Sequence, residues 1–177
     1  MFARHMLSIA ALSLAVAGCQ TVQQLPNARI GSATLHFANG LPAGTAQLFG
    51  NGSEVTISIA LAGFTPGVHA VHLHTTGKCD APDFTSAGGH LNPGGKQHGR
   101  DNPAGAHLGD LPNITIGQNG TGTVSASLAG PQAEVLGDIF DKDGTAVIVH
   151  AGPDDYKTDP SGAAGGRIAC GVVKAAS

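Results

Sequence analysis

The sequence of 177 residues has few charged side chains and no excess of basic ones. Nine Lys and Arg stand against twelve Asp and Glu, which gives a net charge of −3 at pH 7. Nucleic-acid binding depends on clustered positive charge, so this balance excludes a nucleic-acid partner. No basic amphipathic segment indicates a helix lying on a membrane surface, and no internal repeat is present. We therefore expect one domain that acts on a small partner.

Long apolar runs are lacking as well. The run from Met6 to Ala17 follows the basic Arg4, and its length of about a dozen residues is well short of the roughly twenty that span a bilayer. A short apolar run behind a basic start is typical of a secretory signal peptide. Because Val16-Ala17-Gly18-Cys19 resembles a bacterial lipobox, we expect residues 1–18 to be removed and Cys19 to carry lipid. The alternative is an ordinary signal peptide with an incidental cysteine.

The lipobox divides the chain into three parts. Residues 1–18 form the signal peptide, residues 19–28 a lipidated tether and residues 29–177 the folded domain. The lipid would anchor the protein to a membrane on the periplasmic side of the bacterial cell envelope. Gln20, rather than Asp, follows the cysteine that would carry lipid, and this resembles lipoproteins that are sent to the outer membrane.

Cysteine is scarce, with three residues in the chain. If Cys19 carries lipid, Cys79 and Cys170 remain as a pair, and an exported compartment permits a disulfide between them. Two buried free thiols are the alternative. A bond would tie a long loop to the C-terminal strand.

Helical periodicity is absent outside the leader, and short β-rich runs are separated by Gly, Pro, Asn and Asp. In one run Val55, Ile57, Ile59 and Leu61 alternate with more polar residues, as expected for a strand with one buried face. We therefore predict an all-β fold with eight strands. Their ranges are 33–37, 44–49, 54–61, 67–75, 113–116, 122–127, 145–150 and 167–173.

Two connections, 76–111 and 151–166, are too long for a plain β-sandwich and need a reason to be ordered. Bound metal would order them, because these glycine-rich segments carry clustered metal ligands. His72 and His74 are two residues apart on a predicted strand, so both rings project from the same face. His150 ends another apolar strand and would bring a third imidazole, which suits copper. The remaining residues supply three nitrogens and one carboxylate, as in a closed tetrahedral zinc site: His90, His98, His107 and Asp110.

Several motifs in order resemble the copper/zinc superoxide dismutases, especially their exported bacterial branch, over nearly all of the predicted domain. The motifs span residues 67–74 (GVHAVHLH), 86–93 (SAGGHLNP), 97–99 (QHG), 107–111 (HLGDL) and 165–171 (GGRIACG). The resemblance implies an eight-stranded Greek-key β-barrel or sandwich with two long metal-bearing loops. It also implies a copper ion and a zinc ion as cofactors, superoxide as the substrate, and dismutation to oxygen and hydrogen peroxide. Relatives of this kind occur as monomers and as dimers, so a homodimer is possible.

The resemblance also assigns roles to individual residues. It implies copper at His72, His74, His90 and His150, and zinc at His90, His98, His107 and Asp110. His90 would bridge the two metals and carry one proton in the reaction. Arg167 would guide and hold the anion, because a guanidinium stays charged and offers a fork of donors. Asp154 matches a carboxylate that hydrogen-bonds metal-ligating histidines from outside.

His69 and Lys78 are two further residues for which the sequence predicts a role. His69 is an odd number of residues from His72, so it points away from copper and has a structural role. The second long loop shows no evident excess of positive charge, and we expect Lys78 to supply the missing cation near copper.

A periplasmic copper or zinc storage protein is the alternative function, although such a protein would not need Arg167. A dinuclear zinc hydrolase would need more oxygen ligands and a catalytic carboxylate, which are missing.

Overall fold

The structure, a computed structural model, describes residues 27–177. The predicted signal peptide, Cys19, which we expect to carry lipid, and most of the predicted tether lie outside the described residues. None of the helices within residues 27–177 has the length and apolar character of a membrane-crossing segment.

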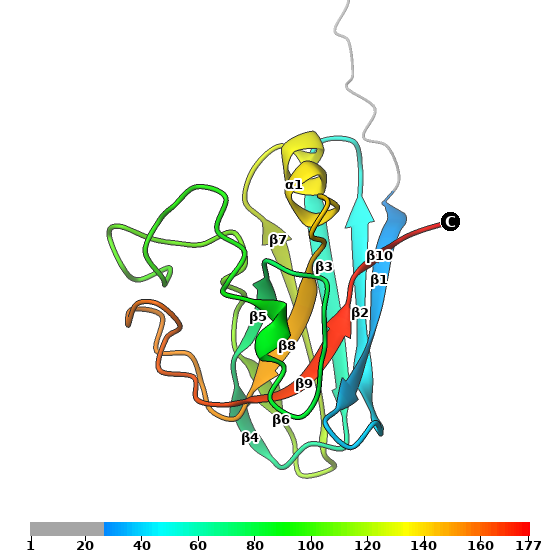
Figure 1. The fold of residues 1–177 in the computed structure, drawn as a ribbon, viewed down its shortest axis with the longest axis vertical. Helices are drawn as coiled ribbons and strands as arrows, with labels where there is room; N and C mark the ends of the chain where they lie inside the picture. Colours follow the sequence, from blue (N-terminus) through cyan, green and yellow to red (C-terminus); the bar gives the residue numbers. More distant parts are fainter. Residues whose placement is uncertain (1–26) are drawn as a thin grey trace, which may run out of the picture.

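Ten strands form in the described part of the chain, and eight of them belong to one strongly curled sheet (Figure 1). The strands are β1 (Ala28–Phe37), β2 (Pro42–Gly50), β3 (Val55–Ala62), β4 (Gly67–His69), β5 (Val71–His74), β6 (Ile114–Ile116), β7 (Thr121–Leu128), β8 (Ala146–His150), β9 (Arg167–Val172) and β10 (Lys174–Ala175). The large sheet has the order β5-β8-β9-β1-β2-β3-β7, with β10 also paired to β1, and β4 pairs with β6 separately. This arrangement confirms the predicted all-β Greek-key fold.

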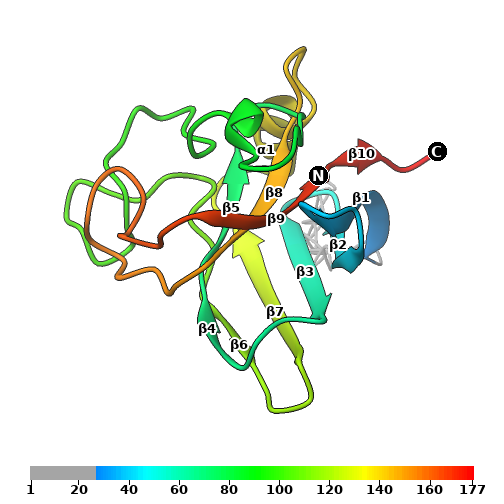
Figure 2. The same cartoon turned by 60° about the horizontal axis from the view of Figure 1, so that its bottom comes forward.

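Alternation of apolar and polar residues explains why these strands close around one core. In β3 the side chains of Val55, Ile57, Ile59 and Leu61 are buried, and the residues between them are more exposed. Each fully buried aliphatic side chain of this kind contributes about 1.5–3 kcal/mol relative to an exposed one. Figure 2, in which the lower end of the barrel comes forward, shows the strands curling around this interior, while the long loops lie outside it.

The predicted strand 67–75 is divided at Ala70 into β4 and β5. The Ala70 amide donates to the Gly152 carbonyl at 2.8 Å, and its own carbonyl accepts the His150 amide at 2.9 Å. This residue therefore hydrogen-bonds to the end of β8 and to the loop that follows it. The division brings the second long loop against the start of β5.

The structure has a short helix although the sequence shows no helical periodicity outside the leader. Helix α1 (Gln132–Ile139) follows Pro131, and a short 3₁₀ turn, η1 (Thr85–Ala87), lies in the first long loop. In α1 Val135 and Ile139, four residues apart, are buried against the core. Leu136 also packs against the core, but a helix of eight residues is too short for its helical period to stand out in the sequence.

Two long segments leave the barrel on the same side: residues 75–113 between β5 and β6, and residues 151–166 between β8 and β9 (Figures 1 and 2). We call them the first and the second long loop. They contact each other directly, because the Asp101 amide donates to the Tyr156 carbonyl at 3.1 Å. The Arg100 guanidinium also lies 3.9 Å from the centre of the Tyr156 ring. The two loops therefore form one joint structure over one side of the sheet.

Candidate metal centre

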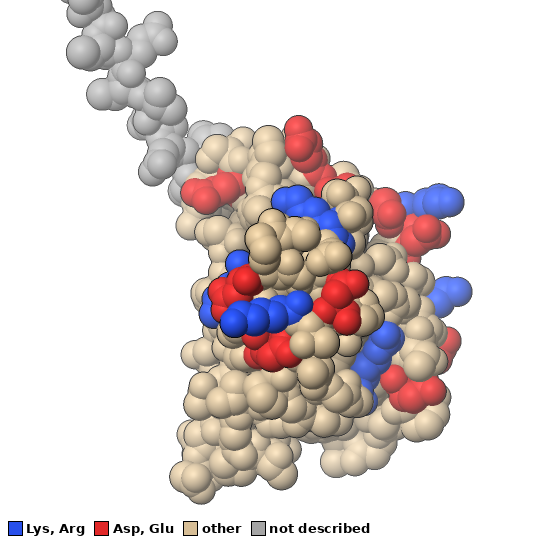
Figure 3. All heavy atoms as spheres, turned by 90° about the vertical axis from the view of Figure 1, so that its left-hand side faces the viewer, with Lys and Arg blue, Asp and Glu red and all other residues tan. Residues whose placement is uncertain are grey.

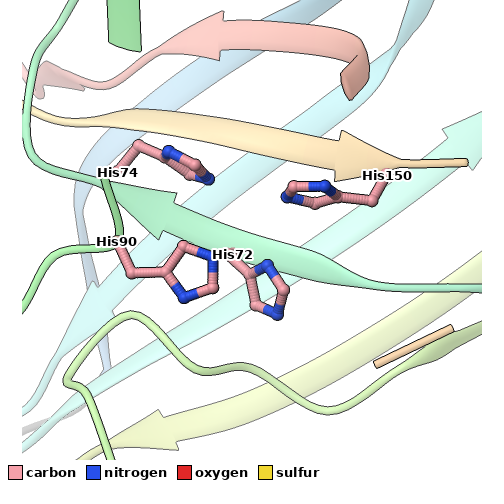
Figure 4. Close-up of side chains that lie close together, drawn as sticks. All are labelled: His72, His74, His90 and His150. Carbon is pink, nitrogen blue, oxygen red and sulfur yellow. The ribbon is translucent and has the colours of Figure 1, made fainter. Parts of the chain in front are cut away.

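Strands β5 and β8 place three histidines on one side of the sheet. The strands pair antiparallel, with His72 opposite Ile148 and His74 opposite Ala146. Val71 and Leu73 belong to the hydrophobic core, so the alternate residues His72 and His74 project from the other face. His150 ends β8. Figure 4 shows these three rings and the ring of His90, from the first long loop, facing a common space.

In each of the three strand histidines one ring nitrogen contacts the protein. The Nδ1 atoms of His74 and His150 lie 2.9 and 3.1 Å from the carbonyl oxygens of Gly88 and Gly165, to which they donate. His72 Nε2 donates to Asp154 Oδ2 at 2.9 Å. These contacts fix each ring's orientation and determine which nitrogen keeps a free lone pair.

The opposite nitrogens of these rings are buried and have no hydrogen-bond partner. The same holds for Nε2 of His90, so the four orphaned atoms are His72 Nδ1, His74 Nε2, His90 Nε2 and His150 Nε2. These four residues present ligand atoms that all lie within 4.8 Å of one another. Because buried polar atoms are almost always paired, four unpaired nitrogens around one space fit a bound metal ion. An all-imidazole set suits copper.

Burial keeps three of these imidazoles, those of His74, His90 and His150, in the neutral form. It lowers the pKa of His74 from its ordinary 6.5 to about 2, and the pKa values of His90 and His150 to about 4. Neighbouring rings lower these pKa values further, because two adjacent imidazolium ions would repel each other. A neutral ring has the lone pair that a metal ion needs, so no proton has to be displaced at neutral pH.

A second group of four ligand atoms consists of Oδ1 of Asp110 and three ring nitrogens around it. The Nδ1 atoms of His90, His98 and His107 lie 3.0, 2.9 and 3.1 Å from this oxygen. His98 Nδ1 forms no hydrogen bond there despite the short distance, and the Nδ1 atoms of His107 and His90 are 3.4 Å apart. Ligands of a tetrahedral zinc ion, with bonds of about 2.0–2.1 Å, would be about 3.3 Å apart. The atoms therefore fit a closed zinc site.

The other oxygen of Asp110 is used by the backbone. Oδ2 accepts the amides of Gly99 at 2.8 Å and His107 at 2.9 Å, which turns Oδ1 toward the histidines. Burial would raise the pKa of the Asp110 carboxyl, but hydrogen bonds from His90 and from these two amides outweigh that effect and lower it. The carboxylate is thus ionised, as a zinc ligand must be.

Two residues connect the two ligand groups. His90 presents Nε2 to the four-histidine group and Nδ1 to the Asp110 group, so its ring belongs to both groups. Asp154, from the second long loop, accepts His72 Nε2 on one oxygen and His98 Nε2 on the other, both at 2.9 Å. Its carboxylate thus orients one ring from each group.

Asn113 and Tyr156 hold Asp154 in place, and the sequence analysis found neither. The Asp154 amide donates to Asn113 Oδ1, and Asn113 Nδ2 donates back to the Asp154 carbonyl, each at 2.9 Å. The Tyr156 amide donates to Asp154 Oδ1 at 2.7 Å. A single Asn at a strand start and a single Tyr in a loop carry no sequence signal for this role.

A cavity of about 500 Å³ leads to the four-histidine group. His74, His90 and His150 line it, together with Arg167. The guanidinium of Arg167 donates to the carbonyls of Phe84 and Gly88, both at 2.7 Å. These bonds hold its positive charge at the cavity. His69 lies elsewhere, buried, with Nδ1 2.8 Å from the His150 carbonyl, which agrees with the expected structural role.

The expected disulfide is present. Cys79 in the first long loop and Cys170 in β9 are bonded, with Cα atoms 5.7 Å apart. The bond attaches the segment that carries Phe84 and Gly88 to the strand that carries Arg167.

The fold and the two adjacent ligand groups define a class: a Greek-key β-barrel protein that holds a copper ion and a zinc ion side by side. The family model described as copper/zinc superoxide dismutase (SODC) matches residues 43–173. The chain belongs to the copper/zinc superoxide dismutase family. It is an oxidoreductase that uses copper and zinc.

Individual relatives agree with this assignment. Superoxide dismutase [Cu-Zn] 1 of Aquifex aeolicus is 46% identical over 136 residues, which cover 74% of this chain and 79% of the relative. The Caulobacter vibrioides superoxide dismutase [Cu-Zn] is 40% identical over 149 residues, covering 81% of this chain and 84% of the relative. The crystal structure of a SOD-like protein from Bacillus subtilis has a TM-score of 0.73 and 36% identity, and the match covers 83% of this chain and 99% of that chain.

Proposed function

We propose that copper binds His72, His74, His90 and His150, and that zinc binds His90, His98, His107 and Asp110, with the His90 ring shared between the ions. One observation carries this proposal: four buried ring nitrogens without a protein partner surround one space. Beside them, four further ligand atoms lie at the spacing of a tetrahedral zinc site.

The enzyme converts two superoxide anions and two protons into one dioxygen and one hydrogen peroxide. Bound copper supplies the one-electron couple for both half-reactions, whereas zinc has no redox chemistry of its own. The chain supplies the rest of the machinery. Arg167 binds the anion beside the four-histidine group. Nε2 of His90 would hold one of the protons that hydrogen peroxide requires at the stage when it is not bound to copper. Nδ1 of His90 faces the zinc group, so the ring stays in place while that proton comes and goes.

Arg167 separates this function from metal storage. A storage protein needs the eight ligand atoms but no positive charge in an open cavity. Here the guanidinium is fixed by two carbonyls at the wall of the cavity that reaches the four-histidine group. Such a donor fork is suited to a small oxyanion.

Replacing His150 tests the copper assignment. In His150→Ala one of four copper nitrogens is lost and the zinc group is intact. We expect superoxide decay after loading with copper and zinc to slow by at least about 100-fold, because copper then lacks one of its four nitrogen ligands. Zinc content, measured by atomic emission on the same sample, should remain one per chain.

Two further variants serve as controls. His36→Ala removes an exposed histidine outside both groups and should leave the rate unchanged. Arg167→Ala should lower the rate at full copper and zinc content. Full turnover in His150→Ala would refute the copper assignment, and full turnover in Arg167→Ala would favour a different anion site.

We further propose that the protein is an exported lipoprotein, anchored through Cys19 on the periplasmic side of the bacterial cell envelope, with the outer membrane favoured. The basic Arg4, the apolar run 6–17 and the lipobox-like residues 16–19 support this. We expect the protein, expressed in a Gram-negative host, to sediment with membranes. Cys19→Ala should lack the lipid by mass spectrometry and leave the membrane fraction. An unlipidated, freely soluble wild-type protein would instead indicate an ordinary signal peptide.

The homodimer stays a prediction. Leu41 and Val68, with 60% and 42% of their surface exposed, are the large hydrophobic residues that a second copy could cover. Sedimentation equilibrium of the metal-loaded protein decides between one chain and two.

A further inference from the structure

The Asp110 group, to which we assign zinc, is almost completely enclosed by protein. The side chains of His98, Asp110 and His90 have 0%, 2% and 3% of their surface exposed, and that of His107 has 6%. The group is therefore open to solvent mainly at His107. This residue lines two hollows: the cavity that reaches the four-histidine group, and a groove beside helix α1.

The groove lies between the first long loop and helix α1, and we call it the α1 groove. It consists of two adjoining hollows of about 390 and 280 Å³, whose walls share Asn92, Pro93 and Asp138. Asn92, Lys96 and His107 line both the larger hollow and the cavity, so these three residues form a wall between the two. A metal ion could approach His107 from either side of this wall.

The charges on the two sides of this wall differ in sign. The cavity is lined by two cations, Arg167 and Lys96, and by one carboxylate, that of Asp159. The α1 groove is lined by one ammonium group and four carboxylates, which belong to Lys96, Glu134, Asp138, Asp141 and Asp143. A positive ion is therefore favoured in the α1 groove and disfavoured in the cavity.

The rest of this side of the molecule shows no comparable separation of charge. Figure 3, which views the protein from the side of the long loops, shows basic and acidic side chains interspersed, with no extended patch of one sign. Salt screens charges that are more than about 8–10 Å apart at physiological ionic strength. The charges within each hollow therefore decide which ions gather in it.

Two of the four carboxylates, those of Glu134 and Asp138, line the same hollow as His107. They are four residues apart on α1, so both side chains lie on one face of the helix. Neither forms an ion pair within residues 27–177. Glu134 is exposed and Asp138 is half-buried. Two negative charges without a bonded counter-charge thus stand at the approach to His107.

The His107 ring leads from the α1 groove to an atom that lacks a partner. Its Nε2 donates to the Lys96 carbonyl at the wall, at 3.1 Å, and its Nδ1 lies 3.1 Å from Asp110 Oδ1 inside the group. Beside that oxygen, at 2.9 Å, is His98 Nδ1, which is buried and unpaired. Because buried polar atoms are almost always paired, this nitrogen indicates a cation as the missing partner.

We propose that the zinc ion reaches the Asp110 group from the α1 groove, past His107, and that Glu134 and Asp138 attract it there. These two residues are no ligands of the bound ion. They act on the rate at which it arrives, because each negative charge attracts a divalent ion twice as strongly as a monovalent one. The inference rests on the proposed zinc assignment, since the ion must end in the Asp110 group.

The test follows metal uptake by the metal-free protein, with Co²⁺ as the probe. Co²⁺ accepts the same tetrahedral nitrogen and oxygen ligands as zinc and, unlike zinc, absorbs visible light when bound. Stopped-flow mixing gives the association rate constant at about 10 mM and about 300 mM ionic strength, where screening is weak and strong respectively. Excess chelator gives the dissociation rate constant. His98→Ala removes one ligand and so identifies the absorbance that belongs to the Asp110 group.

Three further proteins are compared with the wild type. The groove variant, Glu134→Gln with Asp138→Asn, removes two negative charges from the α1 groove. The matched control, Glu54→Gln with Asp80→Asn, removes two negative charges from exposed residues that line neither the α1 groove nor the cavity. Arg167→Gln tests the other route, because it removes a positive charge from the cavity.

We expect the groove variant to bind Co²⁺ about five- to tenfold more slowly than the wild type at the low ionic strength, and less than about twofold more slowly at the high one. Its dissociation rate constant should rise by no more than about twofold, because all four ligands remain, whereas a disrupted site would release the ion faster at both ionic strengths. The matched control and Arg167→Gln should bind within about twofold of the wild-type rate.

Failure of the route and failure of the zinc assignment give different results. If the groove variant binds Co²⁺ as fast as the matched control, the route through the α1 groove is wrong and the zinc assignment is untouched. Faster binding by Arg167→Gln, by about fivefold or more, would place the entry in the cavity instead. If the absorbance of the wild type does not depend on His98, the zinc assignment and this inference are overturned together.

Discussion

The orientation of each of these histidine rings is set by the group that accepts its N–H. A backbone carbonyl receives the N–H of His74 and of His150, and the Asp154 carboxylate receives those of His72 and His98. The tautomer is therefore fixed before a metal arrives, and the free nitrogen points into the site. A preset geometry of this kind reduces the cost of ordering ligands on binding.

A substitution of Asp154 should disturb this arrangement most, because its carboxylate orients two of the rings. In Asp154→Asn one ring N–H would face an amide N–H instead of an oxygen, so one of His72 and His98 would lose its acceptor. We expect zinc affinity to fall by about 10- to 100-fold, as is usual when such an outer partner is removed. A chelator-competition titration of the purified protein measures it.

Asp155→Asn is the matched control, because Asp155 is the adjacent acid and is exposed. Its carboxylate bonds Thr158 and Lys157 and touches no histidine. Equal zinc affinity in Asp154→Asn and Asp155→Asn would show that the ring orientation is set elsewhere.

Among the elements, the second long loop depends on Tyr156 for its attachment. The Tyr156 hydroxyl accepts the Asn113 amide at 2.8 Å, and its ring lies under Arg100. Gly99 of the first long loop runs so close to the Tyr156 carbonyl that an added Cβ would collide with it. The two loops are thus packed backbone to backbone at this point.

Replacing Tyr156 with Phe removes only the hydroxyl. The Asn113 amide then loses its acceptor, which costs about 1–3 kcal/mol if water cannot replace it. We expect faster hydrogen exchange in residues 97–102 and 151–166, with unchanged exchange in β2 and β3. Uniform exchange across the whole barrel would show that the loops do not open as a separate unit.

The elements themselves divide into those that the sequence could predict and those that it could not. All eight predicted runs are strands, because alternation and turn residues are local signals. Strand β10, with two residues paired to β1, and the division at Ala70 depend on contacts made by distant segments. Likewise residue type and spacing were enough to predict the residues of the two groups that could hold metal. The expectation that Lys78 lies near the copper group is not supported, because Lys96 and not Lys78 lines the cavity that reaches it. The path of the loop decides this, and it cannot be deduced from residue type.

At the scale of the whole molecule, the disulfide joins the parts that the metal centre needs. Cys79 and Cys170 are 91 residues apart, so the bond closes a large part of the chain into one loop. It holds Phe84 and Gly88 near β9, where their carbonyls accept the Arg167 guanidinium. Stability and the position of the Arg167 guanidinium are therefore linked through one covalent bond.

The double variant Cys79→Ser and Cys170→Ala tests this link. Alanine is chosen for Cys170 because that residue is buried and a hydroxyl there would add a cost of its own. Restoring the entropy of a loop of this size to the unfolded chain should destabilise the metal-free protein by about 4.6 kcal/mol. That corresponds to a Tm about 9–18 °C lower in calorimetry. Wild type treated with dithiothreitol should have the same Tm as the variant. The metal-loaded variant should show a lower kcat/KM than the metal-loaded wild type at temperatures below its Tm, because Arg167 is less firmly placed. A Tm within about 2 °C of wild type would mean that the barrel and the zinc-side loop contacts already restrict the chain as much as the covalent bond does.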